Sequence, residues 1–322
     1  MTAAVQAPTP PAKAVRRDGR TGRRRGVGRF AALLLSPTVL VLALVIGYPI
    51  ISALRLSFLV THQGINPNTG MVENTTHAGL ANYATIFSGD SADQFWNAFW
   101  NTTTFTVAGV ALETVLGVAM ALIMHKAFRG RGIVRASVLV PWAIPTAISG
   151  LLWKWIFQSD GIANTVLHTH VLWTTEGFHA WGAVLIADVW KTAPFIGLLA
   201  LAGLQVIPGD VYEAARVDGS GPWRTFFRIT LPLARPALVV AVLFRMLDAL
   251  RMFDLPFVLI GAHKHSVETL STFAWYEASN LRYGTAAAYS TVLFLYIAVV
   301  AFVFVKVLGA DLIGRGVEGK KK

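Results

Sequence analysis

The sequence predicts an all-α polytopic membrane protein with about six transmembrane helices. Of its 322 residues, 54% are hydrophobic and only 14% are charged, whereas soluble domains are about 25% charged. Six stretches reach the roughly 20 apolar residues that a spanning helix needs. They are residues 30–54, 97–124, 136–157, 181–207, 237–260 and 285–305. The outer helices of a soluble protein would each carry a charged face, but the first and last stretches have no charge.

The first apolar stretch follows a basic arm, residues 1–29, that is rich in Pro, Ala, Arg and Gly. Such a composition predicts a disordered segment at the cytoplasmic membrane surface. The arginine pairs of the arm could belong to an export signal, but the apolar run behind them is too long for one. We therefore expect the first helix to be retained.

The remaining stretches differ in how cleanly apolar they are. Residues 97–124 contain one acidic residue, Glu113, for which we expect a structural role and a hydrogen bond to a neighbouring helix. Residues 285–305 carry no charge, whereas the third, fourth and fifth stretches are interrupted by proline, glycine or charge. Interruptions of this kind are tolerated in spanning helices when neighbouring helices satisfy the freed backbone groups.

Basic residues alternate between the segments that join these stretches. The segments 58–95 and 158–179 hold no Lys or Arg, whereas the second and fourth loops and the two terminal segments are basic. The positive-inside rule then places both termini, including the tail 311–322, and the even-numbered loops in the cytoplasm. The net charge of +11 therefore indicates contact with membrane lipid and not with nucleic acid.

Several kinds of chemistry are not expected of this chain. It has no cysteine, which removes thiol chemistry and cysteine metal ligands. Two His-x-His pairs, at 168–170 and 263–265, lie on predicted outer loops without a carboxylate cluster, and we expect no metal site. No G-x-x-x-x-G-K-[ST] phosphate loop occurs. The chain is therefore not expected to be an enzyme or to contain catalytic residues.

The fourth loop, residues 208–232, has the signals of two short helices. Asp210 is a candidate N-cap, with Glu213 as its capping-box partner. Gly219 is suited to end this helix. Pro222 is suited to begin a second helix over 223–229, and Pro232 marks the entry into the fifth span. Capping alone would account for Glu213.

The whole loop is more specific, because it reads E-A-A, three residues, G, nine residues, I-x-L-P. The matching residues are Glu213, Ala214, Ala215, Gly219, Ile229, Leu231 and Pro232. This string resembles the EAA loop of binding-protein-dependent ABC importer permeases. The resemblance implies a type I ABC importer permease fold over residues 30–310, with a coupling helix that docks on a cytoplasmic ATPase. The coupling residues that it implies are Glu213, Ala214, Ala215, Arg216, Asp218 and Gly219.

A wider resemblance points to carbohydrate import. The string D-V-W-K-T-A-P-F at 188–195 looks like the span before the EAA loop in maltose-type permeases. Within that subfamily, the sequence is most like the SugA-type permeases of trehalose importers. The implied function is one permease subunit of an ATP-driven sugar importer in the bacterial inner membrane, forming half of the pathway for a disaccharide, trehalose. A permease for another oligosaccharide or glycerol phosphate is the first alternative.

The resemblance also implies the partners of the chain. They are a second permease subunit in a heterodimer, a cytoplasmic ATPase dimer that holds ATP and Mg, and an external solute-binding protein. The solute-binding protein would dock on segments 58–95 and 158–179, and this chain would carry no cofactor. An ion-coupled secondary transporter would show inverted repeats instead, and a membrane-embedded enzyme would need a nucleophile or metal group on facing helices.

Sugar contacts carried over from the maltose-type permeases fall on two predicted helices. They are Asp188, Lys191, Thr192 and Phe195 before the loop, and Phe244, Leu247, Asp248 and Arg251 after it. Each set follows i, i+3, i+4, i+7 spacing and so shares one helix face. Arg245, Asp248, Arg251 and Asp254 also recur every third residue with alternating sign. An intrahelical ion-pair ladder and sugar contact are both open interpretations of that spacing.

Overall fold

The computed structural model describes residues 20–65, 72–89 and 91–309, in two units that divide between Ala53 and Leu54. Helix α1 (Arg20–Leu42) passes through a π-turn (Ala43–Gly47) into α2 (Tyr48–Ser57), and the division between the units falls within α2. The helix begins ten residues before the predicted span, so the last part of the predicted basic arm is helical. Arginine is a good helix former, and a helix propagates readily from an apolar nucleus. Residues 1–19 of the arm and the predicted tail 311–322 lie outside the described residues.

After the end of α2, the second unit continues with elements that were not predicted from the sequence. Strands β1 (Leu59–Ile65) and β2 (Val72–Ala78) form an antiparallel hairpin in which Leu59 pairs with Ala78, and α3 (Ala81–Ser88) follows. The signal was present, since two β-prone runs flank the turn-forming letters N-P-N-T-G. The expected helical, polytopic fold is confirmed, and the hairpin of β1 and β2 is an addition to it.

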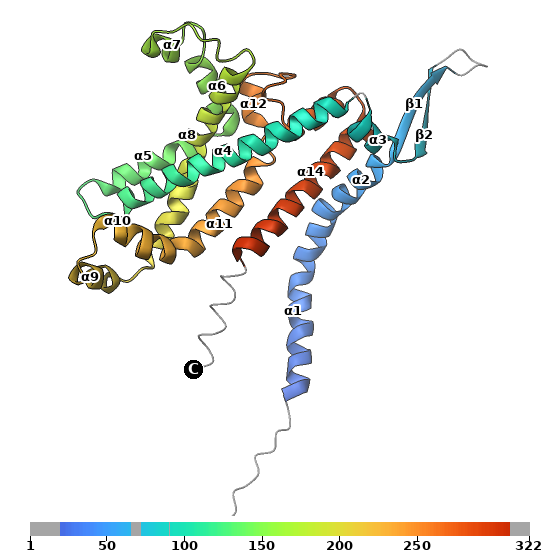
Figure 1. The fold of residues 1–322 in the computed structure, drawn as a ribbon. Helices are drawn as coiled ribbons and strands as arrows, with labels where there is room; N and C mark the ends of the chain where they lie inside the picture. The colour runs from blue at the N-terminus through green and yellow to red at the C-terminus, as the bar shows by residue number, and fades with distance from the viewer. Residues whose placement is uncertain (1–19, 66–71, 90, 310–322) are drawn as a thin grey trace, which may run out of the picture. The chain divides into compact units, whose positions relative to one another are not determined.

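Long apolar helices form most of the second unit (Figure 1). They are α4 (Ala92–His125), α8 (Phe178–Gln205), α11 (Leu231–Ala249) and α14 (Tyr283–Phe304), the last followed by a π-turn (Val305–Gly309). Across the described residues of both units, five helical segments are long and apolar enough to cross a membrane, and a bent pair makes a sixth. α4 and α8 pack closely, because a Cβ atom on Gly117 would lie 2.9 Å from the backbone nitrogen of Gly197. Small residues allow this approach between spanning helices.

The third predicted span is broken. It consists of α5 (Arg131–Ala143) and α6 (Thr146–Ile156), which meet at 94°. Ile144 between them is extended, with φ −72° and ψ 133°, as a residue before proline usually is. Pro145 therefore ends the first half, and the proline interruption predicted in the stretch 136–157 is a sharp bend between two helices.

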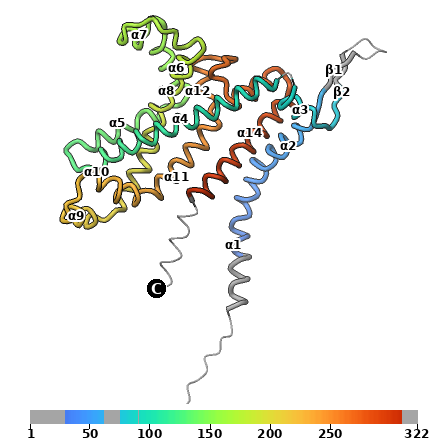
Figure 2. Tube along the Cα trace, in the orientation of Figure 1, coloured from blue at the N-terminus to red at the C-terminus, as the bar shows by residue number. Residues whose placement is uncertain are grey.

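The fifth span differs from its predicted bounds. The short α10 (Pro222–Thr225) passes through a π-turn (Phe226–Thr230) directly into α11, so that one helical segment of 28 residues runs to Ala249 (Figure 2). Pro232 does not start a new helix, because a π-turn is one of the adjustments by which spanning helices pass a proline. The predicted stretch 237–260 instead breaks after Ala249.

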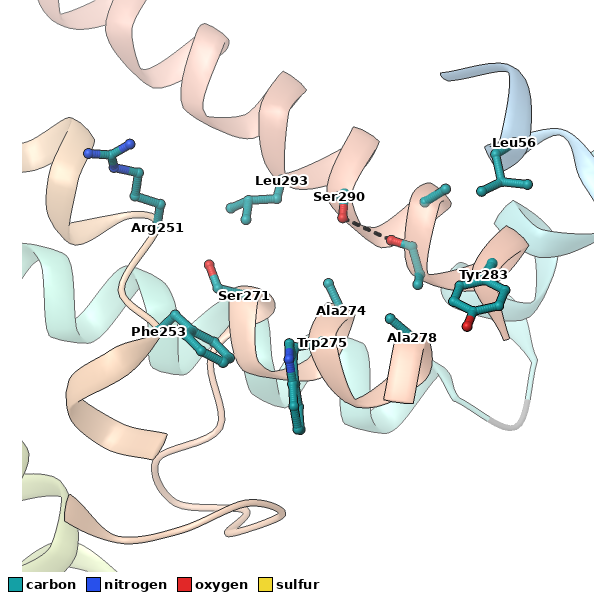
Figure 3. A pocket seen from close by; sticks show the side chains of 12 residues that line it. Leu56, Arg251, Phe253, Ser271, Ala274, Trp275, Ala278, Tyr283, Ser290 and Leu293 are labelled. Atoms are coloured by element: carbon teal, nitrogen blue, oxygen red, sulfur yellow. Dashed lines mark hydrogen bonds between the residues drawn. The ribbon is translucent and has the colours of Figure 1, made fainter. Parts of the chain in front are cut away.

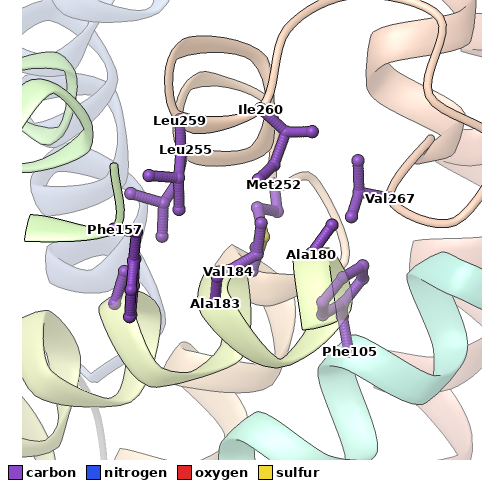
Figure 4. Close-up of a cluster of buried hydrophobic side chains, with 11 residues drawn as sticks. Phe105, Phe157, Ala180, Ala183, Val184, Met252, Leu255, Leu259, Ile260 and Val267 are labelled. Atoms are coloured by element: carbon purple, nitrogen blue, oxygen red, sulfur yellow. The ribbon is translucent and has the colours of Figure 1, made fainter. Parts of the chain in front are cut away.

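Shorter helices complete the unit. They are α7 (Ile162–Leu167), α9 (Gly209–Val217), α12 (Asp254–Leu259) and α13 (Leu270–Ser279). A capping box at Thr269 starts α13. Figure 4 shows one buried cluster, in which Phe105 of α4, Val184 of α8 and Leu255 of α12 come together. This packing fixes the break after α11 against α4 and α8.

Candidate functional site

A buried ion-pair network joins three spanning helices. Arg245 of α11 donates from Nε to Glu113 Oε2 at 2.6 Å and from Nη2 to Glu113 Oε1 at 3.0 Å. The same Nη2 also donates to Asp188 Oδ2 on α8. Thr192 Oγ1, one turn further along α8, donates to Glu113 Oε1 at 2.7 Å. Glu113 is therefore hydrogen-bonded to neighbouring helices, as predicted, but it forms the centre of an ion-pair network and not an isolated structural contact.

The network continues toward the surface of the chain through Asp248. Arg245 Nη1 donates to Asp248 Oδ2 at 3.3 Å, and Arg251 Nη2 donates to Asp248 Oδ1 at 3.1 Å. The side chains of Asp248 and Arg251 are 56% and 70% exposed, whereas Arg245 is only 3% exposed. Of the predicted ladder, the first three members are thus linked. Arg251 lies beyond the end of α11, so it does not share a helix face with Phe244 and Asp248, and that expectation is wrong.

Lys191 has a different partner. Its side chain is buried, and Nζ donates to the backbone oxygen of Ile144 at 2.5 Å. Ile144 lies in the break between α5 and α6, where its carbonyl has lost its helical partner. An unsatisfied carbonyl is costly at membrane depth, and Lys191 satisfies it from α8.

A polar cavity of about 280 Å³ lies beside this network. Five of the eight predicted sugar-contact residues line it: Asp188, Lys191, Thr192, Asp248 and Arg251. Arg245 and Asp254, for which sugar contact was one of two open interpretations, also line it, together with Thr146 at the start of α6, which was not predicted. The volume is near the lower end of the range for ligand pockets, about 300–1,000 Å³.

The other three predicted contacts lie elsewhere. Phe195 stacks on Trp142 of α5, with ring centroids 5.9 Å apart. Phe244 is exposed and Leu247 is half-buried, and neither lines the polar cavity. The helical face that was predicted for the fifth span is therefore divided, with Asp248 on the cavity side.

A second cavity, of about 520 Å³, shares Arg251 and Phe253 with the first. Figure 3 shows Arg251 near one end of it and Tyr283 near the other, with small side chains of α13 and α14, such as Ala274 and Ser290, between them. Arg251 thus lines both cavities.

The loop helix α9 is capped differently from the prediction at its start and as predicted at its end. It begins at Gly209 with Pro208 as N-cap, and no side chain caps it, so the capping box of Asp210 and Glu213 is wrong. Proline restricts its own φ, and the extended Pro208 ends the preceding chain without a side-chain cap. At the other end Gly219 has φ +70°, a conformation that glycine adopts without strain.

Two backbone hydrogen bonds close the end of α9. Ser220 N donates to Ala215 O at 2.9 Å, and Gly219 N donates to Arg216 O at 3.1 Å. This is the Schellman pattern. Ala215 is buried, whereas Glu213, Ala214, Arg216 and Asp218 are exposed. Pro222 then starts α10, as predicted.

A large cavity of about 1,290 Å³ separates this loop from the end of α4. Lys126 and Arg216 line it together with the aromatic rings of Tyr212 and Trp223. Trp223 is exposed and stacks on Phe227, with centroids 6.2 Å apart. The loop helix is therefore held away from the end of α4 and presents charged and aromatic side chains.

On the opposite side, the segment between α12 and α13 is fixed by α4. Asn101 Nδ2 donates to the backbone oxygens of His265 and Glu268 at 2.7 and 3.1 Å. His263 Nδ1 lies 3.5 Å from Glu268 Oε1. Burial, followed by the negative charge of Glu277, raises the pKa of Glu268 to about 7.

These features together define a subunit of a membrane transport system: a polar cavity between spanning helices, connected by one continuous helix to a capped loop helix. The chain belongs to the family described as binding-protein-dependent transport system inner membrane component, which residues 113–318 match. It is 38% identical over 306 residues to the trehalose transport system permease protein SugA of Mycobacterium tuberculosis, covering 94% of this chain and 95% of that protein. It is also 38% identical to the trehalose/maltose transport system permease protein MalF of Thermococcus litoralis, covering 87% and 93%.

A solved structure confirms the expected type I ABC importer permease fold. It is a bacterial alginate ABC transporter in complex with an alginate pentasaccharide-bound periplasmic protein. The two structures match with a TM-score of 0.72 at 22% sequence identity, and the match covers 90% of this chain and 96% of the chain in the solved structure. The family, the fold and the membrane location of the chain are thereby established.

Proposed function

We propose that the chain is one of two permease subunits of an ATP-driven importer of a disaccharide, with trehalose as the first candidate. The observation that carries the proposal is the polar cavity itself, in a chain that is 38% identical to permeases named for trehalose and for trehalose/maltose. Charged groups and the aromatic Phe253 line the cavity. Sugars use both kinds of surface, because their hydroxyls hydrogen-bond and their C–H faces are apolar.

The size of the cavity supports a shared pathway. At about 280 Å³, it falls short of most pockets that enclose a ligand of drug size. A second permease subunit would complete it. The second cavity shares Arg251 and Phe253 with the first. In this proposal it connects the polar cavity of this chain with the half of the pathway that the second permease subunit contributes.

The energy for import would come from separate ATPase subunits that hold ATP and Mg. Helix α9 is the docking element in this proposal, and Glu213, Ala214, Arg216 and Asp218 are its exposed contacts. The orientation follows the basic residues, with both termini and α9 in the cytoplasm of a bacterial cell. A solute-binding protein would then deliver the sugar to the outer segments, which include the hairpin of β1 and β2.

The test is ATP-dependent uptake of labelled trehalose and maltose into proteoliposomes that contain the co-expressed complex. Glu213→Lys is expected to abolish uptake and to weaken co-purification with the ATPase. Arg129→Glu, which reverses one charge on the other predicted cytoplasmic loop, should leave co-purification unchanged. Uptake without ATP that persists in Glu213→Lys would refute the importer proposal and favour a secondary transporter. Uptake of glycerol phosphate and of neither sugar would keep the importer and refute the sugar.

A further inference from the structure

The large cavity beside the loop helix α9 has no part in the proposed sugar pathway. Its volume of about 1,290 Å³ lies between α9, α10 and the end of α4. Pockets that enclose ligands of drug size measure about 300–1,000 Å³. The cavity therefore has room for a ligand larger than most small molecules that proteins enclose.

The apolar wall of this cavity is formed by the ends of three spanning helices. Leu122 of α4, Leu204 of α8 and Phe226, in the turn that leads into α11, all line it. Each of them belongs to a helical segment that is long and apolar enough to cross a membrane, and each lies within four residues of the end of that segment. Such ends lie where the hydrocarbon core of a bilayer meets the polar headgroups. The apolar wall is therefore at the depth of lipid acyl chains.

The same cavity has a cationic wall. Lys126 and Arg216 line it and are exposed, and neither has an ion-pair partner within 4.0 Å among the residues that the structure describes. The described residues of its lining include no Asp or Glu. Thr225 Oγ1 donates to Ser220 Oγ at 3.1 Å, which leaves the Ser220 hydroxyl proton for another acceptor. Two cations and a hydroxyl donor suit the oxygens of a phosphate group.

Helix α9 presents different faces to the cavity and to the predicted ATPase. Tyr212 and Arg216 are four residues apart and so lie on one face of the helix, and both line the cavity. Glu213, Ala214 and Asp218 are exposed but do not line it. A ligand in the cavity and an ATPase docked on these three residues therefore use different sides of α9.

We propose that this cavity binds an anionic phospholipid from the leaflet on the side of α9. The phosphate would lie between Lys126 and Arg216, and an acyl chain would cover Leu122, Leu204 and Phe226. Inorganic phosphate would satisfy the cations but leave the apolar wall in water, so the cavity favours a molecule with both parts. The bound lipid would connect the loop after α4 with α9 and so stabilise the position of the coupling helix. The proposal does not depend on which solute the importer carries.

The test uses the purified complex of permease and ATPase in nanodiscs of phosphatidylcholine. The probe is a small fraction of phosphatidylglycerol with a photoactivatable diazirine in its acyl chain, and the cross-linked peptides are mapped by mass spectrometry. Labelling is expected on the peptides that contain Leu122, Leu204 and Phe226. Unlabelled phosphatidylglycerol should compete for these sites, whereas inorganic phosphate should not. Lys126→Gln should lower the labelling about fivefold, as expected when one cation near an anionic lipid is removed.

Arg129→Gln is the matched control, because it removes a charge from the same loop at an exposed residue that does not line the cavity. It should leave the labelling unchanged. Equal labelling in the two variants, or equal labelling by a phosphatidylcholine probe, would overturn the proposal. Labelling that occurs only without the ATPase would show that the ATPase fills the cavity, and competition by inorganic phosphate would show a simple anion site; either result would also overturn it. Labelling does not require transport, so an absence of trehalose uptake would refute the proposed function alone.

Discussion

Replacing Arg245 with methionine tests whether the buried network holds the spanning helices together. Arg245→Met keeps most of the side-chain volume but removes the cation that Glu113 and Asp188 share. Glu113 is fully buried and Asp188 nearly so. Both carboxylates would then be left at membrane depth without a counter-charge.

The magnitude follows from the contacts. At a charge separation of about 4 Å and an effective dielectric constant of about 20, each pair contributes about 4 kcal/mol of attraction. Desolvation offsets much of this, at several kcal/mol for each ion. Removing one partner of a buried pair costs about 3–5 kcal/mol, because the remaining charge is uncompensated. We therefore expect Arg245→Met to lower the free energy of unfolding by about this amount.

Arg251→Met provides the matched control, since it removes an arginine whose only described ion pair, with Asp248, is exposed. Exposed pairs contribute about 0–1 kcal/mol. Thermal unfolding of the purified complex, followed by size-exclusion fluorescence, should show a fall in Tm of about 5 °C or more for Arg245→Met and about 2 °C or less for Arg251→Met. Equal shifts for the two variants would refute the network as the source of stability.

Two further predictions concern the two sides of the protein. The folded-state pKa of Glu268 lies at about 7, above its ordinary 4.5, so the folded state binds the carboxyl proton more tightly than the unfolded state does. The contribution of protonated Glu268 to stability is therefore fully present below pH 4.5 and is lost as pH rises through 7. Thermal unfolding between pH 5 and pH 8 should show this decline, and Glu268→Gln should flatten it; an equal decline in the variant would assign the effect to another group. Gly219→Ala forces a left-handed conformation on alanine at a cost of about 1–2 kcal/mol and should weaken co-purification with the ATPase. Gly221→Ala, at a residue with φ −68°, should leave co-purification unchanged. Equal co-purification of the two variants would contradict the role of the Gly219 cap.

The existence of the spans was predictable from the sequence, but their ends were not. Hydrophobic length identifies a helix at membrane depth because every backbone group there must be satisfied. The same rule does not say where a helix stops. Pro232 reads as a boundary, but the helix continues through a π-turn ahead of it. Pro145 also interrupts an apolar run, and there the chain turns by 94°. The difference lies in the neighbours: Lys191 is in place to satisfy the carbonyl of Ile144.

The candidate site was predictable in part. Helical spacing brought Asp188, Lys191 and Thr192 onto one face, and the structure places all three at one cavity. The pairing of Glu113 with Arg245 spans 132 residues, and no local pattern encodes it. A signal did exist, because an isolated acid in an otherwise apolar span needs a cation from another span. Charge matching between spans would have proposed Arg245 as a candidate, though not as the unique one.

The uninterrupted helix from Pro222 to Ala249 has a mechanical consequence. From Pro222 to Arg245 the axis is about 35 Å long, at 1.5 Å per residue. If its far end is fixed, a tilt of about 10° displaces the near end by about 6 Å over that length. Packed interfaces switch between discrete arrangements and do not deform smoothly. A tilt of about 10° with its pivot at Arg245 would therefore move α10 sideways by about 6 Å while the three carboxylate contacts of Arg245 shift little.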